Sequence, residues 1–203
     1  MQHPAILAFE SLLAARNASP GAEARARIDE QIRERYQRPL AVMIGDMSGF
    51  SRITQAHGIL HFLGLIQRMR ALAAPIVRGH GGSLVKFEAD NLYATFPSPD
   101  AALDAAIDLH AACESSARDP DDTVRMSLGL GFGPVLDIDG VDFYGDQVNL
   151  ASKLGEDIAE AGEVLVSQDF LESCSDRKGW FWDKRFTRIS NIGFDYYSLM
   201  RKN

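Results

Sequence analysis

The chain has little cysteine, no excess of positive charge and no long apolar run. Its two cysteines, Cys113 and Cys174, lie far apart in the sequence and match no metal-binding spacing, which favours reduced thiols. The net charge of −7 argues against non-specific nucleic-acid binding, because that needs a basic surface. The N-terminus lacks the features of a signal peptide, and no segment approaches the ~18–20 apolar residues of a transmembrane helix. We therefore expect a cytoplasmic protein that binds no nucleic acid and inserts into no membrane.

The composition that remains is that of an ordinary globular protein. The 203 residues are 46% hydrophobic and 24% charged, which predicts one domain with a short appendage. Apolar residues recur at helical spacing over 4–17 and more sparsely over 22–36, with a breaker cluster at 17–21. We therefore divide the chain into an N-terminal helical extension, residues 1–38, and a main domain, residues 39–203. The extension either covers one edge of the domain or serves in dimer contact or regulation.

The main domain has the pattern of an α+β fold. Its first elements are expected, in chain order, as a strand over 39–47, a helix over 58–78, strands over 83–87 and 92–96, a helix over 99–116 and a strand over 124–132. This βαββαβ order is typical of the ferredoxin-like fold, in which the first strand is central and lies beside the third. Further along we expect a tight turn at 48–51, a helix over about 147–160, a strand over 163–167, a short helix over 168–174 and strands over 180–200.

Two aspartates are candidates for a metal site. Asp46 ends the first strand and Asp90 lies in the hairpin before the third, so the topology brings both to one end of the sheet. Two carboxylates that converge in this way are a common means of holding Mg²⁺ or Mn²⁺, which bridge phosphate oxygens. In the turn after Asp46, Ser48 and Gly49 can aim backbone N–H groups at phosphates as a helix begins. The alternative is that both aspartates are ordinary turn residues.

Four segments together resemble one enzyme family. They are IGDMSGFS at 44–51, LVKFEADNLYATF at 84–96, RMSLGLGFGPV at 125–135 and DFYGDQVNLASKL at 142–154. In order and spacing they are similar to the catalytic domain of the class III nucleotidyl cyclases, the adenylyl and guanylyl cyclases. The likeness covers roughly residues 40–175, which is most of the chain.

This resemblance implies an activity and a set of metal ligands. It implies an adenylyl cyclase that converts ATP to 3′,5′-cyclic AMP by attack of the ribose 3′-hydroxyl on the α-phosphate, with release of pyrophosphate. Two Mg²⁺ or Mn²⁺ ions per active site assist this attack. Asp46 and Asp90 match the metal-binding aspartates, and Met47 matches the residue whose backbone carbonyl also reaches a metal. We assign Ser48, Gly49 and Phe50, which follow directly, to substrate binding.

The resemblance also implies residues that select the base and act on the ribose and α-phosphate. Lys86 lies four residues before Asp90, and Asp142 lies seven before Asn149, as in the family. Lysine donates to adenine N1 and aspartate accepts from its exocyclic amine, whereas guanylyl cyclases typically carry Glu at the first position. Asn149 matches the residue that orients the ribose. Lys153 stands where the family usually has Arg, and it keeps the charge but lacks the bidentate fork, so we expect weaker catalysis.

Each of these four residues has a structural alternative. Lys86 would be an exposed strand lysine, Asp142 a turn residue, Asn149 a helix cap and Lys153 a solvated helix lysine. A further departure concerns the triphosphate, because Ser190 stands where the family often has a lysine. The nearby basic residues Lys184, Arg185 and Arg188 are left unassigned. The glycine-rich run at 129–133 lacks the helix of a dinucleotide fingerprint, so we expect a strand with a turn there.

In this family each active site lies between two catalytic domains. This chain holds both the metal-binding and the base-selecting residues, so the resemblance implies a head-to-tail homodimer with two equivalent sites. Two alternatives to an adenylyl cyclase stay open. One is a cyclase for another nucleotide, which makes a cyclic pyrimidine nucleotide in phage defence or cyclic GMP. The other is a degenerate cyclase domain that dimerises or senses a nucleotide.

Overall fold

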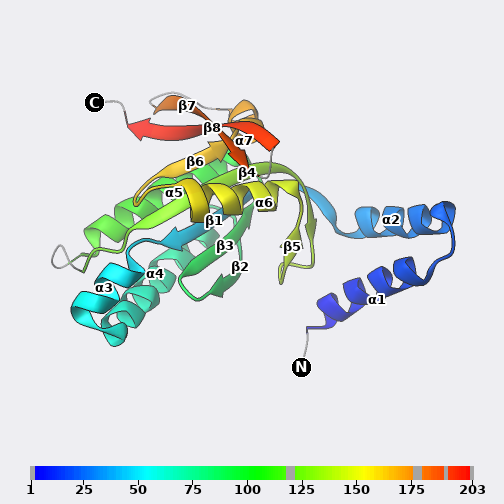
Figure 1. Ribbon diagram of the computed structural model, residues 1–203, viewed down its shortest axis with the longest axis horizontal. Coiled ribbons are helices and arrows are strands. Elements are labelled where there is room, and N and C mark those ends of the chain that lie inside the picture. Colours follow the sequence, from blue (N-terminus) through cyan, green and yellow to red (C-terminus); the bar gives the residue numbers. More distant parts are fainter. Residues whose placement is uncertain (1–2, 118–121, 176–179, 190–191, 202–203) are drawn as a thin grey trace.

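Within the residues that the computed structural model describes (3–117, 122–175, 180–189 and 192–201), one mixed sheet of eight strands organises the chain (Figure 1). The strands are β1 (Gln37–Met47), β2 (Ser83–Glu88), β3 (Asn91–Phe96), β4 (Met126–Asp137), β5 (Phe143–Tyr144), β6 (Val164–Ser167), β7 (Trp180–Ile189) and β8 (Ile192–Arg201). Their order is β2-β3-β1-β4-β6-β8-β7, and β5 pairs with β4. The expected α+β fold is confirmed, with β1 central and beside β3.

The helices are α1 (Pro4–Ala18), α2 (Ala22–Tyr36), α3 (Phe50–His57), α4 (Ile59–Gly79), α5 (Pro99–Ser115), α6 (Asp146–Ser152), the π-helix η2 (Lys153–Ile158) and α7 (Gln168–Ser173). Most lie within two residues of the expected ranges. The prediction of a tight turn at 48–51 is incomplete, because α3 begins at Phe50 immediately after Gly49. This helix has eight residues and one buried side chain, Ile53, so its apolar periodicity is too short to be recognised. The expected helix over 147–160 is α6 followed by η2.

The alternation of apolar side chains along β1 places helices on both faces of the sheet. Ala41, Met43 and Met47 belong to the large core that α4 and α5 cover. Val42 and Ile44 point to the opposite face, where they pack with Ala151 of α6. Since side chains alternate along a strand, Asp46 lies on the α6 face with Val42 and Ile44.

Glycines in β4 allow α6 and η2 to approach the sheet closely. A Cβ at Gly129 would lie 2.1 Å from the carbonyl oxygen of Ala151, and one at Gly131 would lie 2.7 Å from that of Gln147. On the helix side, a Cβ at Gly155 would lie 2.4 Å from the carbonyl oxygen of Ile44. The expected turn within 129–133 is wrong, because β4 runs without interruption to Asp137. The glycines of this run serve helix packing instead.

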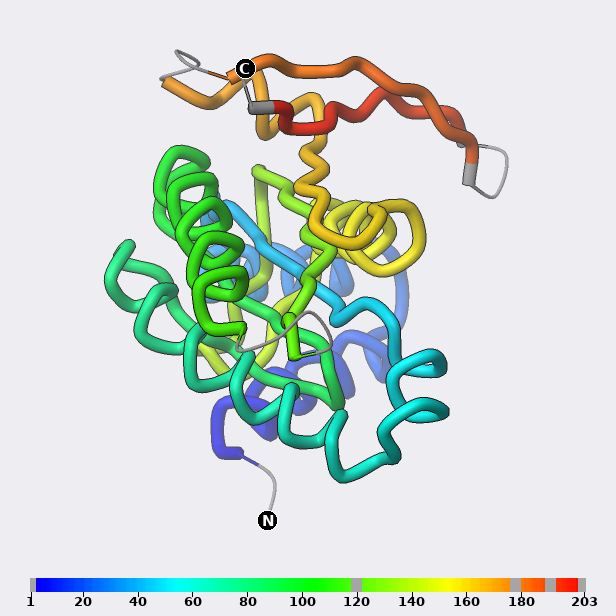
Figure 2. The backbone as a smooth tube through the Cα atoms, turned by 90° about the vertical axis from the view of Figure 1, so that its left-hand side faces the viewer, coloured from blue at the N-terminus to red at the C-terminus, as the bar shows by residue number. Residues whose placement is uncertain are grey.

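The N-terminal helices pack on the projecting end of β4 and β5. We call the segment from Leu136 to Tyr144, which includes both strand ends and the turn between them, the arm. Phe9 of α1 and Tyr36 of α2 share a small apolar core with Ile138 of the arm. Figure 2 shows α1 at the opposite end of the molecule from the hairpin of β7 and β8. Among the described residues, no helix has the length and apolar character needed to span a membrane.

Candidate active site

Asp46 and Asp90 meet at one end of the sheet, as the topology predicts. Gly45, which precedes Asp46, pairs with Leu92 across β1 and β3, and Asp90 lies two residues before Leu92, in the turn between β2 and β3. Burial and, to a smaller extent, the nearby negative charges of Asp90 and Glu156 together raise the pKa of Asp46 to about 6. The backbone N–H of Met47, which hydrogen-bonds the Asp46 carboxylate, acts in the opposite direction. This end of the sheet therefore concentrates negative charge, which favours a cation.

Arg70 of α4 holds the turn between β2 and β3 in place. Ala89 has a φ of +50°, an uncommon conformation for a residue with a side chain. Arg70 of α4 donates from Nη2 to the Ala89 carbonyl oxygen at 2.6 Å, and its guanidinium carbon lies 5.3 Å from the Phe87 ring centroid. These contacts fix the turn, and with it Asp90, against α4.

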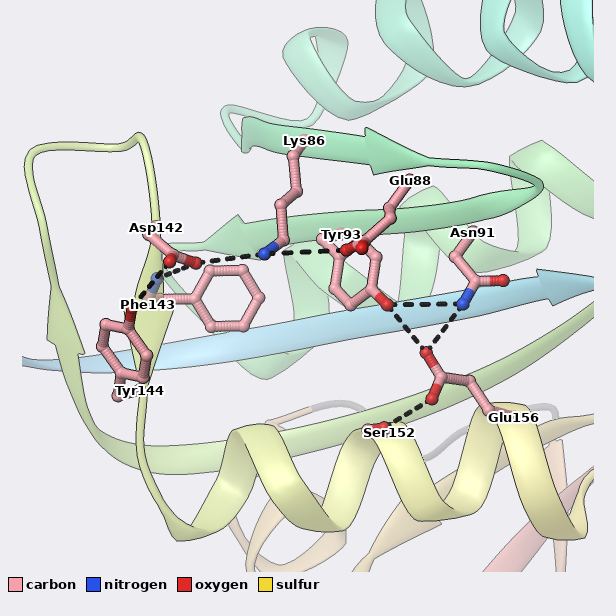
Figure 3. A network of polar contacts seen from close by, with 9 residues as sticks. All are labelled: Lys86, Glu88, Asn91, Tyr93, Asp142, Phe143, Tyr144, Ser152 and Glu156. Carbon is pink, nitrogen blue, oxygen red and sulfur yellow. Dashed lines mark hydrogen bonds and ion pairs between the residues drawn. The ribbon is translucent and has the colours of Figure 1, made fainter. Parts of the chain in front are cut away.

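Glu156 is a residue of this site that the sequence analysis missed. One of its carboxylate oxygens accepts hydrogen bonds from Asn91 Nδ2 and from the Tyr93 hydroxyl, both at 3.0 Å (Figure 3). The other accepts from Ser152 Oγ at 2.6 Å. Glu156 thus ties η2 to β3 while it adds a negative charge near Asp46. No motif marks it, because it reaches the site through the π-helical geometry of η2.

A bulge in β2 directs Lys86 toward the active-site face. Leu84 pairs with Ala94 and Lys86 pairs with Tyr93, so Val85 is an extra residue between them. Without it, Lys86 would lie on the same face as Leu84, which packs in the α4–α5 core. With it, the Lys86 ammonium lies 5.2 Å from the centroid of the Tyr93 ring, on the α6 face.

The structure joins Lys86 and Asp142, which are 56 residues apart in the sequence. Lys86 Nζ donates to Asp142 Oδ1 at 3.3 Å and lies 3.9 Å from Glu88 (Figure 3). The backbone N–H of Phe143 donates to the same Asp142 oxygen at 3.0 Å. The Tyr144 hydroxyl donates to the other oxygen, Oδ2, at 2.7 Å. A donor and an acceptor thus stand side by side in fixed orientations.

Asn149 and Lys153 lie one helical turn apart at the junction of α6 and η2. The N–H of Lys153 still bonds the Asn149 carbonyl, so the expected spacing holds although the π-helix begins at Lys153. Both side chains are exposed. The Lys153 ammonium forms an ion pair with Asp157 at 2.5 Å, and this bond raises the pKa of Lys153. The Lys153 side chain is thus directed to Asp157 of its own helix and not to Asp46, Asp90, Lys86 or Asp142.

The three residues of the predicted phosphate-binding turn, Ser48, Gly49 and Phe50, lie in different environments. Ser48 Oγ lies 3.0 Å from Ser127 Oγ, so its hydroxyl faces β4. Gly49 has a φ of +96°, which a residue with a side chain rarely adopts, and it caps α3 without a side-chain hydrogen bond. Phe50 is half exposed and packs edge-on against Phe62. The N–H groups of the first turn of α3 are therefore not capped by the Gly49 position, as a phosphate-binding helix start requires.

The basic residues of β7 make contacts within the chain. Lys184 pairs with Asp195 at 2.6 Å. Arg185 pairs with Glu163 at 2.8 Å and with Asp183 at 3.0 Å. Ser190 lies outside the described residues.

The donor set fits a divalent cation that shares its ligands with a substrate. Carboxylate oxygens of Asp46 and Asp90 are hard ligands, and their mutual repulsion is relieved by a cation. Within the described part of the chain, no three His, Cys, Asp or Glu side chains gather closely enough to form a complete metal site. Backbone carbonyls, water and phosphate oxygens would therefore supply the remaining ligands.

Comparison with known proteins identifies the family. The family model for the adenylate and guanylate cyclase catalytic domain matches residues 32–190. An adenylate cyclase of Streptomyces coelicolor is 36% identical over 155 residues, which are 76% of this chain and 38% of that protein. The curated relatives that match are much longer, and the match spans between 27% and 38% of the length of the two named adenylate cyclases from Rhizobium meliloti and S. coelicolor.

Solved structures agree in fold. An adenylate/guanylate cyclase/hydrolase from Silicibacter pomeroyi superposes with a TM-score of 0.68 at 26% identity and covers 82% of this chain and 99% of that one. The catalytic core of a rhodopsin-guanylyl cyclase with converted specificity, in complex with ATPαS, superposes with a TM-score of 0.70 at 17% identity, over 83% of this chain and 98% of that one. The chain belongs to the class III adenylyl and guanylyl cyclase catalytic-domain family.

Proposed function

We propose that this chain is an adenylyl cyclase that converts ATP to 3′,5′-cyclic AMP and pyrophosphate. The observation that carries the proposal is the pair of Lys86 and Asp142, a donor and an acceptor 3.3 Å apart on the active-site face. Adenine presents N1 as an acceptor and its exocyclic amine as a donor on adjacent positions, and guanine presents the reverse pattern. The similarity to the S. coelicolor adenylate cyclase supports the same substrate.

Asp46, Asp90 and the carbonyl of Met47 are the proposed ligands of two Mg²⁺ or Mn²⁺ ions. Held by these residues, the ions would offset negative charge that develops at the α-phosphate. Glu156 and Arg70 position this cluster, Glu156 from η2 and Arg70 through the Ala89 carbonyl.

The remaining roles are positioning and charge stabilisation. Ser48, Gly49 and Phe50 would present the start of α3 to the phosphates. Asn149 would orient the ribose so that its 3′-oxygen bonds to the α-phosphorus as the bond to pyrophosphate breaks and the hydroxyl proton departs. Lys153 would stabilise charge on the α-phosphate after it exchanges Asp157 for the substrate.

We further propose a head-to-tail homodimer of the domain formed by residues 39–203. In this arrangement the metal ligands of one protomer face the Lys86, Asp142, Asn149 and Lys153 of the partner. The exposure of the Asn149 and Lys153 side chains is consistent with such an arrangement. The location of the protein in the cytoplasm stays a prediction.

A turnover assay with purified protein tests the proposal. ATP, GTP, CTP and UTP are offered separately with Mn²⁺ or Mg²⁺, and products are identified by mass. We expect cyclic AMP from ATP, and its loss in Asp46→Ala. A cyclic product from another nucleotide keeps the mechanism and overturns the adenine assignment. No product from any nucleotide, in a folded dimer, favours the degenerate cyclase domain, for which the Lys153–Asp157 ion pair is the supporting observation.

Mixing two inactive variants tests the shared site. Asp46→Ala lacks a metal ligand and Asn149→Ala lacks the ribose contact, so each homodimer is expected to be inactive. A mixed dimer would contain one intact site, and we expect part of the activity to return on mixing. If both variants dimerise and their mixture stays inactive, the shared-site arrangement is wrong.

A further inference from the structure

A line of contacts leads from the first helix to the base-selecting aspartate. The ring of Phe9 in α1 stacks on the ring of Tyr144 in β5, with centroids 5.7 Å apart and planes inclined by 13°. The hydroxyl of Tyr144 donates to Asp142 Oδ2 at 2.7 Å, and this hydrogen bond raises the pKa of Tyr144 to about 12. Asp142 Oδ1 then faces Lys86. Three interactions therefore connect residue 9 with residue 86.

The position of Tyr144 depends on what packs beside it. It belongs to a strand of two residues at the end of the arm, and 46% of its surface remains exposed. Phe9 is buried and is itself fixed by an edge-on contact with Tyr36, whose ring centroid is 5.4 Å away. The more deeply buried partner of the Phe9–Tyr144 pair is thus the residue of α1.

The Tyr144 hydrogen bond decides which oxygen of Asp142 serves the base. Each carboxylate oxygen accepts more than one hydrogen bond, but the carboxylate rotates about its terminal bond unless it is held. With Oδ2 held by Tyr144 and Oδ1 held by the Phe143 N–H, the plane of the carboxylate is fixed. Oδ1 then points to the side on which Lys86 lies, where it can accept from an exocyclic amine.

We propose that Tyr144 is a specificity-determining positioning residue, and that α1 sets base selection through the stacking of Phe9 on Tyr144. The helical extension is then part of the nucleotide-recognition machinery and not only a cover for the edge of the domain. This inference rests on the proposed function of Asp142 as a reader of the base. It adds that the reading requires residues which touch neither substrate nor metal.

Nucleotide binding gives a test that does not depend on turnover. Displacement of a fluorescent ATP analogue by ATP and by GTP, with Ca²⁺ in place of the catalytic ions, yields a ratio of dissociation constants. We expect the wild-type chain to favour ATP. Tyr144→Phe, which keeps the ring and removes the hydroxyl, is expected to reduce this preference about three- to tenfold, the worth of one hydrogen bond. Phe9→Leu, which keeps an apolar side chain and loses the stacked ring, is expected to act in the same direction.

Two controls separate positioning from general damage. Leu7→Ala changes an exposed residue of the same helix and is expected to leave the ratio unchanged. Adding Tyr144→Phe to Asp142→Asn is expected to have no further effect, because the residue that Tyr144 positions is already altered. Thermal unfolding of each variant shows whether it is folded.

The outcomes keep this inference apart from the proposed activity. A chain that prefers ATP in binding but forms no cyclic AMP refutes the cyclase activity, and its variants still test the role of Tyr144. A wild-type chain that binds ATP and GTP equally, or binds neither, overturns the inference. So does a Tyr144→Phe variant that is folded and keeps the full preference for ATP.

Discussion

Where β1 ends beside the turn between β2 and β3, Asp90 and Glu156 add negative charge near Asp46, whereas Lys86 of β2 and Asp142 of the arm neutralise each other. We call the first group the acidic cluster and the second the base-reading pair. The acidic cluster contributes like charges that burial makes costly. The base-reading pair is an ion pair in which both carboxylate oxygens of Asp142 already accept hydrogen bonds.

The difference shows which half of the proposed site is complete before the substrate arrives. The base-reading pair is preorganised, so its two side chains need little further ordering when a base binds. The acidic cluster is stable only at the cost of repulsion at Asp46, and in the proposed site it would gain stability when cations enter with the triphosphate. Charge reversal in the base-reading pair should therefore create repulsion, whereas charge removal in the acidic cluster should relieve it.

Reversing the charge of Lys86 should have the largest effect. Lys86→Glu removes the proposed donor to adenine N1 and places two carboxylates side by side. The base-reading pair then consists of like charges, as the acidic cluster does. We expect turnover of ATP to fall by about a hundredfold or more and the ratio of GTP to ATP turnover to rise. Steady-state rates with both nucleotides measure this.

Lys184→Glu is the matched control for this reversal. Lys184 is also paired with an aspartate, Asp195, but it lies in β7 outside the proposed site. It should lose some stability and keep its nucleotide preference. A Lys86→Glu variant that retains the preference for ATP would show that other groups select the base.

The next effect concerns Lys153, whose ion pair with Asp157 would compete with the substrate in the proposed site. Lys153→Ala should lower kcat by about ten- to a hundredfold, because one charged donor to the α-phosphate is lost. Lys153→Arg should raise kcat several-fold, since its fork can hold two oxygens. Rates at saturating ATP measure both changes.

Asp157→Asn tests the competition directly. It leaves Lys153 in place and removes its ion pair, so KM for ATP should fall while the fold is unchanged. If Lys153→Ala has the rate of the wild type, Lys153 is a surface residue and has no part in catalysis.

Much of this site was predictable from the sequence, and the reasons for the misses are specific. Asp46 and Asp90 follow from the βαββαβ order, since that topology places a strand end beside a hairpin. The orientation of Lys86 does not, because it depends on the extra residue Val85, and strand alternation alone predicts the opposite face. Hydrophobic patterns do not record where a register shifts.

Tertiary contacts account for the other misses. Glu156 enters the site through a π-helical turn, and Phe9 reaches Tyr144 across 135 residues of sequence. Both contacts depend on how separate elements pack, and no local pattern encodes them. The glycines of β4 carried a usable signal, however, because Gly129 and Gly131 alternate on one face, where a helix can approach.

A smaller effect should follow from removing one charge of the acidic cluster. In the presence of a chelator, Asp90→Asn should raise the midpoint of thermal unfolding by about 2–4 °C, because it relieves repulsion of Asp46. With Mn²⁺ added, the wild type should gain more stability than the variant, since the variant has lost a ligand. Asp104→Asn, an exposed aspartate of α5, is the control and should do neither.

The smallest effect is a dependence of stability on pH that the acidic cluster adds. The pKa of Asp46 is raised to about 6, so the folded chain binds more protons than the unfolded chain between pH ~4 and 6. The stability that this proton contributes is fully present below about pH 4 and is lost as pH rises through 6. In denaturant unfolding of metal-free protein, the free energy of unfolding of the wild type should therefore contain a contribution that falls as pH rises from about 4 to 6, and Asp46→Asn should lack it.

The comparison with Asp46→Asn is essential, because His110 acts with the opposite sign. Burial lowers the pKa of His110, so its contribution is present above pH ~6.5 and is lost as pH falls. The wild-type curve alone mixes the two, whereas the difference between wild type and Asp46→Asn isolates the acidic cluster. A difference that does not change with pH would mean that Asp46 carries no repulsion for a cation to relieve, and the contrast between the two halves of the site would then be lost.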